Sequence, residues 1–120
     1  MAWKFNSREA VFVQIANKLR CDIVSGKYPP ESQIPSVRQL AYDAAVNPNT
    51  MQKALSMLED EKLVISHGTV GRFVTADEDV LSSAGERIRR ETVKNWLFDA
   101  RMIGMSPEEM IKYIKEESIE

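Results

Sequence analysis

Three prolines stand within residues 29–35 and interrupt the helical patterns around them. Because proline locks φ and removes a backbone donor, residues 27–35 cannot form a helix, and we expect an extended, stiff connector there. Before the connector, apolar residues recur in steps of three and four over residues 9–25, which predicts a separate amphipathic helix. We expect Ser7 to cap the start of this helix and Gly26 to end it.

Two more helices are predicted after the connector. Ser36 is the expected N-cap of a short helix that ends near residues 43–44. A tight turn over residues 45–47 follows. The pair Asn47-Pro48 then starts a third helix, which runs to about Glu61, because Asn is a good N-cap and Pro fits the first helical position.

A β-hairpin is predicted next, from strands at 63–66 and 72–75 joined by the glycine-bearing turn 67–71. Three helices followed by a hairpin is the order of a winged helix-turn-helix, whose third helix enters the major groove. We therefore expect a mainly α chain with a small β-hairpin. A winged helix-turn-helix DNA-binding domain would occupy residues 1–76, and a two-helix C-terminal dimerisation tail would occupy residues 77–120.

The tail is predicted to form one long amphipathic helix from about Val80 to Ile103, ended by Gly104, and a shorter one that starts at the capping box 106–109. Two helices cannot enclose a small-molecule pocket of about 300–1,000 Å³. A long apolar stripe needs a partner, so we expect it to pack against a second copy in a homodimer, the alternative being that it packs on the chain's own N-terminal domain. The expected dimerisation residues are Leu81, Ile88, Trp96, Leu97 and Ile103.

The first turns of the third helix carry polar and mostly uncharged side chains, while Met51, Ala54, Leu55 and Leu58 form its apolar opposite face. Asn and Gln pair well with adenine edges, Thr with phosphate or a base, and Lys with guanine or phosphate. Such residues also occur at ordinary helix starts. The prediction that this helix reads DNA therefore depends on the order of three helices followed by a hairpin. The candidate residues on this helix are Asn47, Asn49, Thr50, Gln52 and Lys53.

The charge is divided unevenly along the chain. The net formal charge of −2 is the sum of +2 over residues 1–76, from 9 Lys/Arg and 7 Asp/Glu, and −4 over residues 77–120, from 7 and 11. The acidic half is not expected to touch phosphate. A net charge of +2 is weak evidence for DNA binding, so the local placement of residues decides.

Two runs of sequence, residues 33–41 (QIPSVRQLA) and 46–54 (VNPNTMQKA), resemble the GntR family of bacterial regulators. The Asn-Pro-Asn-Thr run and the short helical tail are most similar to its YtrA-type subfamily, and the resemblance extends over residues 9–117. It implies a homodimer that binds a double-stranded inverted-repeat operator, and it suggests repression of a small operon, often one that encodes an ABC transporter.

The resemblance also implies roles for individual residues. Arg38 would contact a base or phosphate from the second helix, and Ser36 would cap that helix near phosphate. The remaining contacts would come from Asn49, Thr50, Gln52 and Lys53 on the recognition helix, and from His67, Gly68, Thr69 and Arg72 in the wing, which would approach the minor groove or the backbone.

Two single positions and the wing depart from the family pattern. Glu31 and Ala45 stand where the family usually has glycine. The wing usually reads Arg-Arg-Gly-x-Gly-Thr-Phe-Val, whereas residues 67–74 read HGTVGRFV, so two arginines are lost and Arg72 is gained. The contacts implied for the recognition helix therefore rest on a closer match than those implied for the wing.

Other classes of function have few residues to draw on. With one cysteine, Cys21, and one histidine, His67, the chain offers no disulfide, no metal-ligand spacing and no obvious catalytic set, so we predict neither an enzyme nor a cofactor. No apolar stretch is long enough to cross a membrane and no signal peptide is visible, so a cytoplasmic protein is expected. A winged-helix protein-interaction module without DNA binding is the alternative function, and a small-molecule effector stays open.

Overall fold

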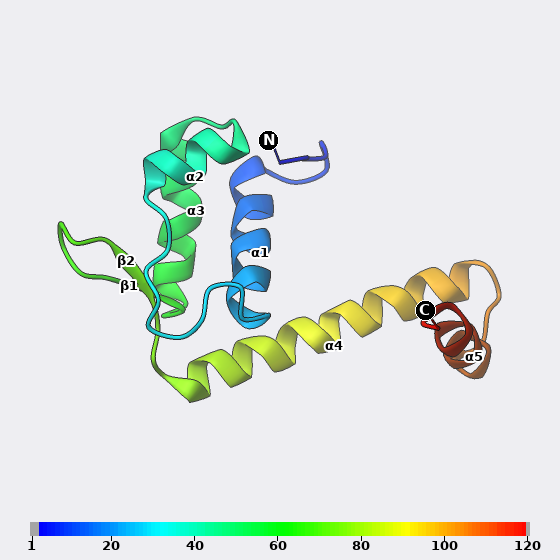
Figure 1. Ribbon diagram of the computed structural model, residues 1–120. Coiled ribbons are helices and arrows are strands. Elements are labelled where there is room, and N and C mark those ends of the chain that lie inside the picture. The colour runs from blue at the N-terminus through cyan, green and yellow to red at the C-terminus, as the bar shows by residue number, and fades with distance from the viewer. Residues whose placement is uncertain (1–2, 120) are drawn as a thin grey trace. The chain divides into compact units, whose positions relative to one another are not determined.

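The computed structural model describes residues 3–119, which form two compact units that divide between Ala84 and Gly85 (Figure 1). The expected mainly α architecture with a small hairpin is confirmed. In chain order the elements are α1 (Val11–Val24), α2 (Val37–Ala44), α3 (Pro48–Asp60), β1 (Val64–Ser66), β2 (Arg72–Val74), α4 (Glu78–Met102) and α5 (Pro107–Glu117).

The predicted starts of α2 and α3 are confirmed. The hydroxyl of Ser36 accepts from the backbone N–H of Gln39, and the side chain of Asn47 accepts from the N–H of Asn49 at 2.7 Å. Between the two helices, Ala45 takes the left-handed conformation with φ of 58° where glycine is easier to accommodate. The turn therefore forms without the glycine that the family usually has there.

The predicted cap of α1 is wrong. The helix begins at Val11 with Ala10 as its N-cap and no side-chain cap, because Ser7 lies too far upstream to reach the first free N–H groups. The carboxamide of Gln14 instead holds the preceding segment, accepting from the N–H of Asn6 and donating to the carbonyls of Asn6 and Glu9.

The proline-bearing connector is extended, as expected, but it also pairs with the hairpin. β1 and β2 are antiparallel, and the connector follows the other edge of β2. The N–H of Ile34 donates to the carbonyl of Arg72 at 3.0 Å, and the N–H of Val74 donates to the carbonyl of Ser32 at 2.9 Å. The hairpin is thus tied to the segment that precedes α2, a contact between distant residues that no local pattern indicated.

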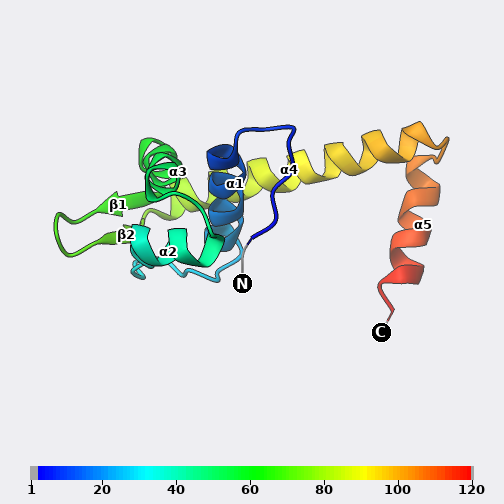
Figure 2. The same ribbon diagram turned by 90° about the horizontal axis from the view of Figure 1, so that it is seen from above.

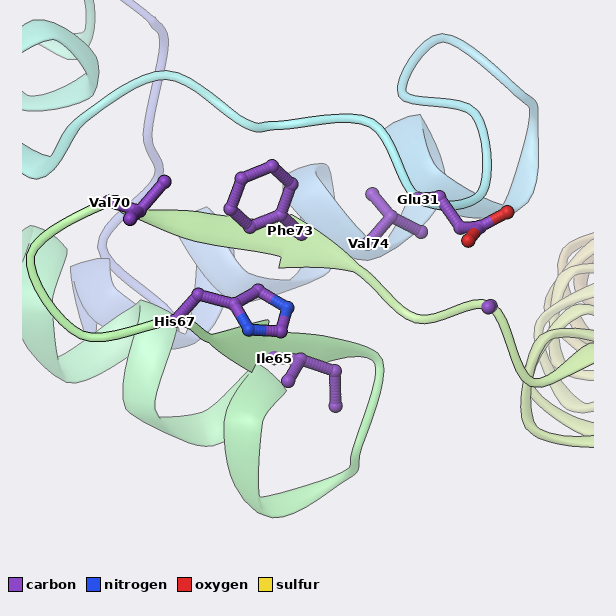
Figure 3. Close-up of a pocket in the computed structure, with 7 residues that line it drawn as sticks. Glu31, Ile65, His67, Val70, Phe73 and Val74 are labelled. Carbon is purple, nitrogen blue, oxygen red and sulfur yellow. The ribbon is translucent and has the colours of Figure 1, made fainter.

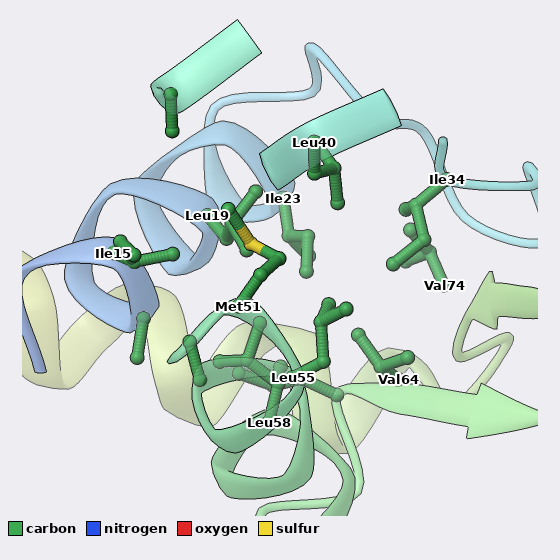
Figure 4. Close-up of a cluster of buried hydrophobic side chains, with 14 of the residues drawn as sticks. Ile15, Leu19, Ile23, Ile34, Leu40, Met51, Leu55, Leu58, Val64 and Val74 are labelled. Atoms are coloured by element: carbon green, nitrogen blue, oxygen red, sulfur yellow. The ribbon is translucent and has the colours of Figure 1, made fainter. Parts of the chain in front are cut away.

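The core of the first unit is shared by all three helices and both strands (Figure 4). Each helix contributes the apolar face that its periodicity predicted, and the two views show α1, α2 and α3 beside one another with the hairpin projecting from them (Figure 2). The first turns of α4 also pack on this core, so the unit extends past residue 76. The largest fully buried side chains are Ile15, Leu19, Leu40, Met51, Leu55, Leu58, Leu63, Val64 and Val74.

The second unit consists of the rest of α4 and the whole of α5. Gly104, with φ of 74°, ends the long helix as predicted. The predicted capping box is confirmed, because Ser106 accepts from the N–H of Glu109 and the Glu109 carboxylate accepts from the N–H of Ser106. The backbone N–H of Ser106, followed by its hydroxyl, holds the pKa of Glu109 below its usual value. Within residues 3–119, no helix combines the length and apolarity that crossing a bilayer requires.

Candidate nucleic-acid interface

Helix α3 has one buried apolar face and one polar face that is open to solvent. Met51 and Leu55 are fully buried, which fixes the rotation of the helix about its axis. Asn49 and Gln52 consequently point to solvent, while Thr50 is half-buried. Neither amide side chain is used by the core, so both are available to hydrogen-bond with a partner.

Two other predicted residues of α3 already have partners within the chain. The Oδ1 atom of Asn47 accepts the capping hydrogen bond, whereas its amide nitrogen is free to donate outward. The ammonium of Lys53 lies 4.1 Å from the ring centre of Phe12 on α1, within the range of a cation–π contact. Lys53 must leave this ring if it is to reach a phosphate or a base.

Helix α2 presents Arg38 to solvent, two residues after the capping residue Ser36. One turn further, at the i+4 position from Arg38, Tyr42 is 82% exposed. Sequence reasoning missed Tyr42, although the helical spacing from Arg38 places both side chains on one face. A phenol that is not needed by the core is a further hydrogen-bonding group on this surface.

The wing is less polar than the family pattern implies. His67 packs edge-on against Phe73 with ring centres 4.9 Å apart, and both line a shallow hollow of about 600 Å³ on one face of the hairpin (Figure 3). At the turn, Gly68 and Thr69 are exposed and Val70 is 66% exposed. The tip therefore offers a small, mostly uncharged surface.

Arg72 does not point freely into solvent. Its Nε atom lies 2.6 Å from Oε1 of Glu59 in the last turn of α3, and only 19% of its side chain is exposed. On the opposite side of the hairpin, Nε2 of Gln33 donates to the carbonyl of Val70 at 2.8 Å. Sequence reasoning named neither Glu59 nor Gln33 as functional, since both contacts join residues far apart in the chain.

The predicted dimerisation residues fall into two groups. Trp96 and Ile103 are 51% and 75% exposed, and Ile88 and Leu97 are half-buried. Leu81, in contrast, packs against the core of the first unit. The exposed part of the stripe therefore lies in the second unit, where a hollow of about 250 Å³ is lined by Trp96, Asp99, Ala100, Ile103, Met105 and Met110.

Two further observations concern titratable groups and possible metal ligands. Burial, followed by the nearby carboxylate of Asp22, raises the pKa of Tyr28 in the connector. Within residues 3–119, no group of three or more His, Cys, Asp or Glu side chains is placed to hold a metal ion.

A capped polar helix on a buried apolar face, preceded by a short helix and followed by a hairpin, defines a winged helix-turn-helix DNA-binding domain. The profile of "Bacterial regulatory proteins, gntR family" matches residues 12–74, from α1 to the end of the hairpin. The chain belongs to this family of transcriptional regulators. Its similarity to YtrA regulators over most of its length supports its place among the YtrA-type members.

Known proteins resemble the whole chain and its first unit. The HTH-type transcriptional repressor YtrA of Bacillus subtilis is 28% identical over 92% of this chain and 85% of its own length. A GntR family regulator from Listeria monocytogenes is 26% identical, covers 97% of this chain and all of its own, and superposes with a TM-score of 0.84. The DNA-binding domain of AraR, solved with operator ORX1, is 25% identical, covers 60% of this chain and 93% of its own, and has a TM-score of 0.55.

Proposed function

We propose that the chain is a transcriptional repressor that binds an inverted-repeat DNA operator as a homodimer. The observation that carries the proposal is the solvent-exposed amide face of α3, which is held outward by the buried face of the same helix. The similarity to a repressor and to a domain that was solved with its operator supports it. A protein-interaction module would need an apolar face at this position, and α3 presents a polar one.

The proposed base contacts come from the exposed side chains of α3. Asn49 and Gln52 would each pair with an adenine edge, because a carboxamide matches its acceptor and donor. Thr50 and Lys53 would contact phosphate or a base, Lys53 after leaving the ring of Phe12. At the start of α3, the side-chain amide nitrogen of Asn47 would donate to the DNA backbone.

Contacts with the DNA backbone would come from α2 and from the wing tip. Arg38 projects from α2, and Ser36 lies at the N-terminus of that helix, where the free N–H groups favour phosphate. His67, Gly68 and Thr69 would approach the adjacent minor groove. Since this tip carries no Lys or Arg, its contribution would depend on shape and hydrogen bonding more than on charge.

The proposed dimer forms through the second unit. Trp96 and Ile103 leave much of their apolar surface in water, and α5 has no buried residue among those described. A second copy of the same surface would cover both by two-fold symmetry. The two recognition helices would then meet successive major grooves about 34 Å apart. Residues 1–76 would read DNA and residues 77–120 would hold the two copies together.

Selection of bound sites from a random duplex library tests the proposal. We expect enrichment of a palindrome whose half-site centres lie about 10 base pairs apart, and a mobility shift of that duplex by the dimer. Enrichment of a single half-site would contradict the dimeric arrangement. A library from which no duplex is enriched would contradict DNA binding and favour the interaction module.

A further inference from the structure

The direction of the Arg72 side chain follows from the register of the hairpin. Ser66 is opposite Arg72 and Val64 is opposite Val74, so these four side chains share one face of the two strands. That face is the buried one, since Val64 and Val74 belong to the core. Arg72 is therefore directed towards the helices, where it meets Glu59 in the last turn of α3. It does not point to the outer face of the hairpin.

The contact between Arg72 and Glu59 is short and largely covered by protein. The 2.6 Å separation joins side chains that are only 19% and 30% exposed. The pair between Arg90 and Glu86 in α4 has a similar length but is 73% and 58% exposed. Exposed pairs of that kind contribute little, whereas a covered pair is less screened by solvent and holds its geometry.

A second contact braces the hairpin from its other side. Gln33 pairs with Phe73 through the backbone, and its side-chain nitrogen donates to the carbonyl of Val70. The nitrogen reaches this carbonyl because Gly71 has no side chain: a Cβ atom there would lie 2.5 Å from Nε2 of Gln33. The wing is thus attached to the recognition helix through Arg72 and to the connector through Gln33.

We propose that Arg72 is a positioning residue, which with Glu59 and Gln33 sets the wing at a fixed angle to the recognition helix and makes no phosphate contact itself. This inference rests on the proposed DNA binding and changes the role that the resemblance implied for Arg72. Arg72 is the only Lys, Arg, Asp or Glu from residue 64 to residue 76. With its charge balanced by Glu59, the wing meets DNA without a net charge.

Salt-dependent binding of the selected duplex distinguishes positioning from phosphate contact. We expect Arg72→Ala to weaken binding about fivefold and to leave the slope of log K against log[salt] unchanged, whereas the loss of one phosphate contact from each protomer would reduce the magnitude of the slope by about 1.8 for the dimer, at about 0.9 per contact. The charge swap Glu59→Arg with Arg72→Glu should bind within about twofold of the wild type, because it re-forms the pair. A reduced slope in Arg72→Ala, or a swap as weak as Arg72→Glu alone, would overturn the proposal.

Backbone ¹⁵N relaxation of the DNA-free protein measures whether the contacts of Arg72 and Gln33 hold the wing in place, and it needs no duplex. Arg72→Ala and Gln33→Ala should each increase the motion of amides 67–71, and the charge swap should restore their order. The matched control is Arg20→Ala, which breaks a covered pair with Glu61 of 2.7 Å just beyond the end of α3 and should leave these amides unchanged.

Two further outcomes of these measurements would count against the proposal. If amides 67–71 are as ordered in Arg72→Ala as in the wild type, the positioning role of Arg72 is excluded, while the proposed function is unaffected. If the wild type binds no duplex, the proposed function is wrong, and so is the role of the Arg72–Glu59 pair in DNA binding. This holds even if the relaxation data show that Arg72 and Gln33 order the wing.

Discussion

The two units of the chain differ in how far they bury their apolar side chains. In the first unit, three helices and two strands converge on one core, and residues such as Leu55 and Leu58 have no exposed surface. In the second unit, Trp96, Phe98 and Ile103 are at least half exposed, and α5 buries none of its described residues. The first unit therefore completes its core with its own residues, whereas the second unit leaves apolar surface that its own residues do not bury.

Truncation of the core should break the first unit with the largest effect. Leu55→Ala truncates a fully buried side chain of α3 in the core, and it should lower the free energy of unfolding by about 2–5 kcal/mol. Hydrogen exchange of the α3 amides measures this loss. The control Ile111→Ala shortens a side chain that is 54% exposed in α5, and it should change the same exchange by less than about 0.5 kcal/mol. Equal losses in both variants would remove the contrast between the units.

A charge in the exposed stripe should separate the two copies. Trp96→Asp or Leu97→Asp places a carboxylate in the proposed dimer surface, so sedimentation should show monomers. Binding of a duplex with two half-sites should weaken about 100-fold, because the second DNA-binding domain is no longer linked to the first. Val70→Asp, an equally apolar-to-acidic change in the wing, is the control and should stay dimeric. Dimers that persist in both tail variants would place the interface elsewhere.

Loss of one polar side chain from the DNA-reading surface should have a smaller effect. Gln52→Ala or Arg38→Ala should weaken operator binding by about 1–3 kcal/mol without changing the oligomeric state. Titration of the selected duplex by mobility shift or fluorescence anisotropy measures this change. Cys21→Ala, at an exposed position of α1, should bind as the wild type does. Unchanged affinity in both Gln52→Ala and Arg38→Ala would exclude these residues from the interface.

The smallest effect is expected from acidification of the second unit. The capping box lowers the pKa of Glu109, first through the backbone N–H of Ser106. The stabilisation is therefore present above the ordinary pKa of a glutamate and is lost as the pH falls through the lowered value. Exchange of the first α5 amides should accelerate, relative to the intrinsic rate, as the pH falls from about 6 to about 3. Glu109→Gln keeps an acceptor, so it should abolish this pH dependence; an unaltered profile would contradict the assignment.

Much of the first unit was predictable because its signals are local. The caps at Ser36 and Asn47, the break at the prolines and the buried face of α3 each depend on residues a few positions apart. The same is true of the ends of the tail helices at Gly104 and Ser106. The cap expected at Ser7 was wrong because apolar periodicity does not define where the first helical turn closes.

What could not be predicted depends on contacts between distant residues. The edge pairing of the connector with β2, the Glu59–Arg72 pair and the contact of Lys53 with Phe12 join elements whose arrangement no short motif encodes. The same applies to Leu81, whose place in the stripe gave no sign that it would pack on the first unit. Tyr42 could have been found, since its spacing from Arg38 was visible.

Neighbouring residues alone indicate which segments are helices, where most of these helices begin and end, and which face of α3 turns inward, because backbone conformation and apolar periodicity are local properties of the chain. Which polar side chains remain free depends instead on how the elements pack once the core has formed. Gln52 is left open to solvent, whereas Arg72 is engaged by Glu59, because a side chain's partners are set by which elements pack together and not by its own position in the chain.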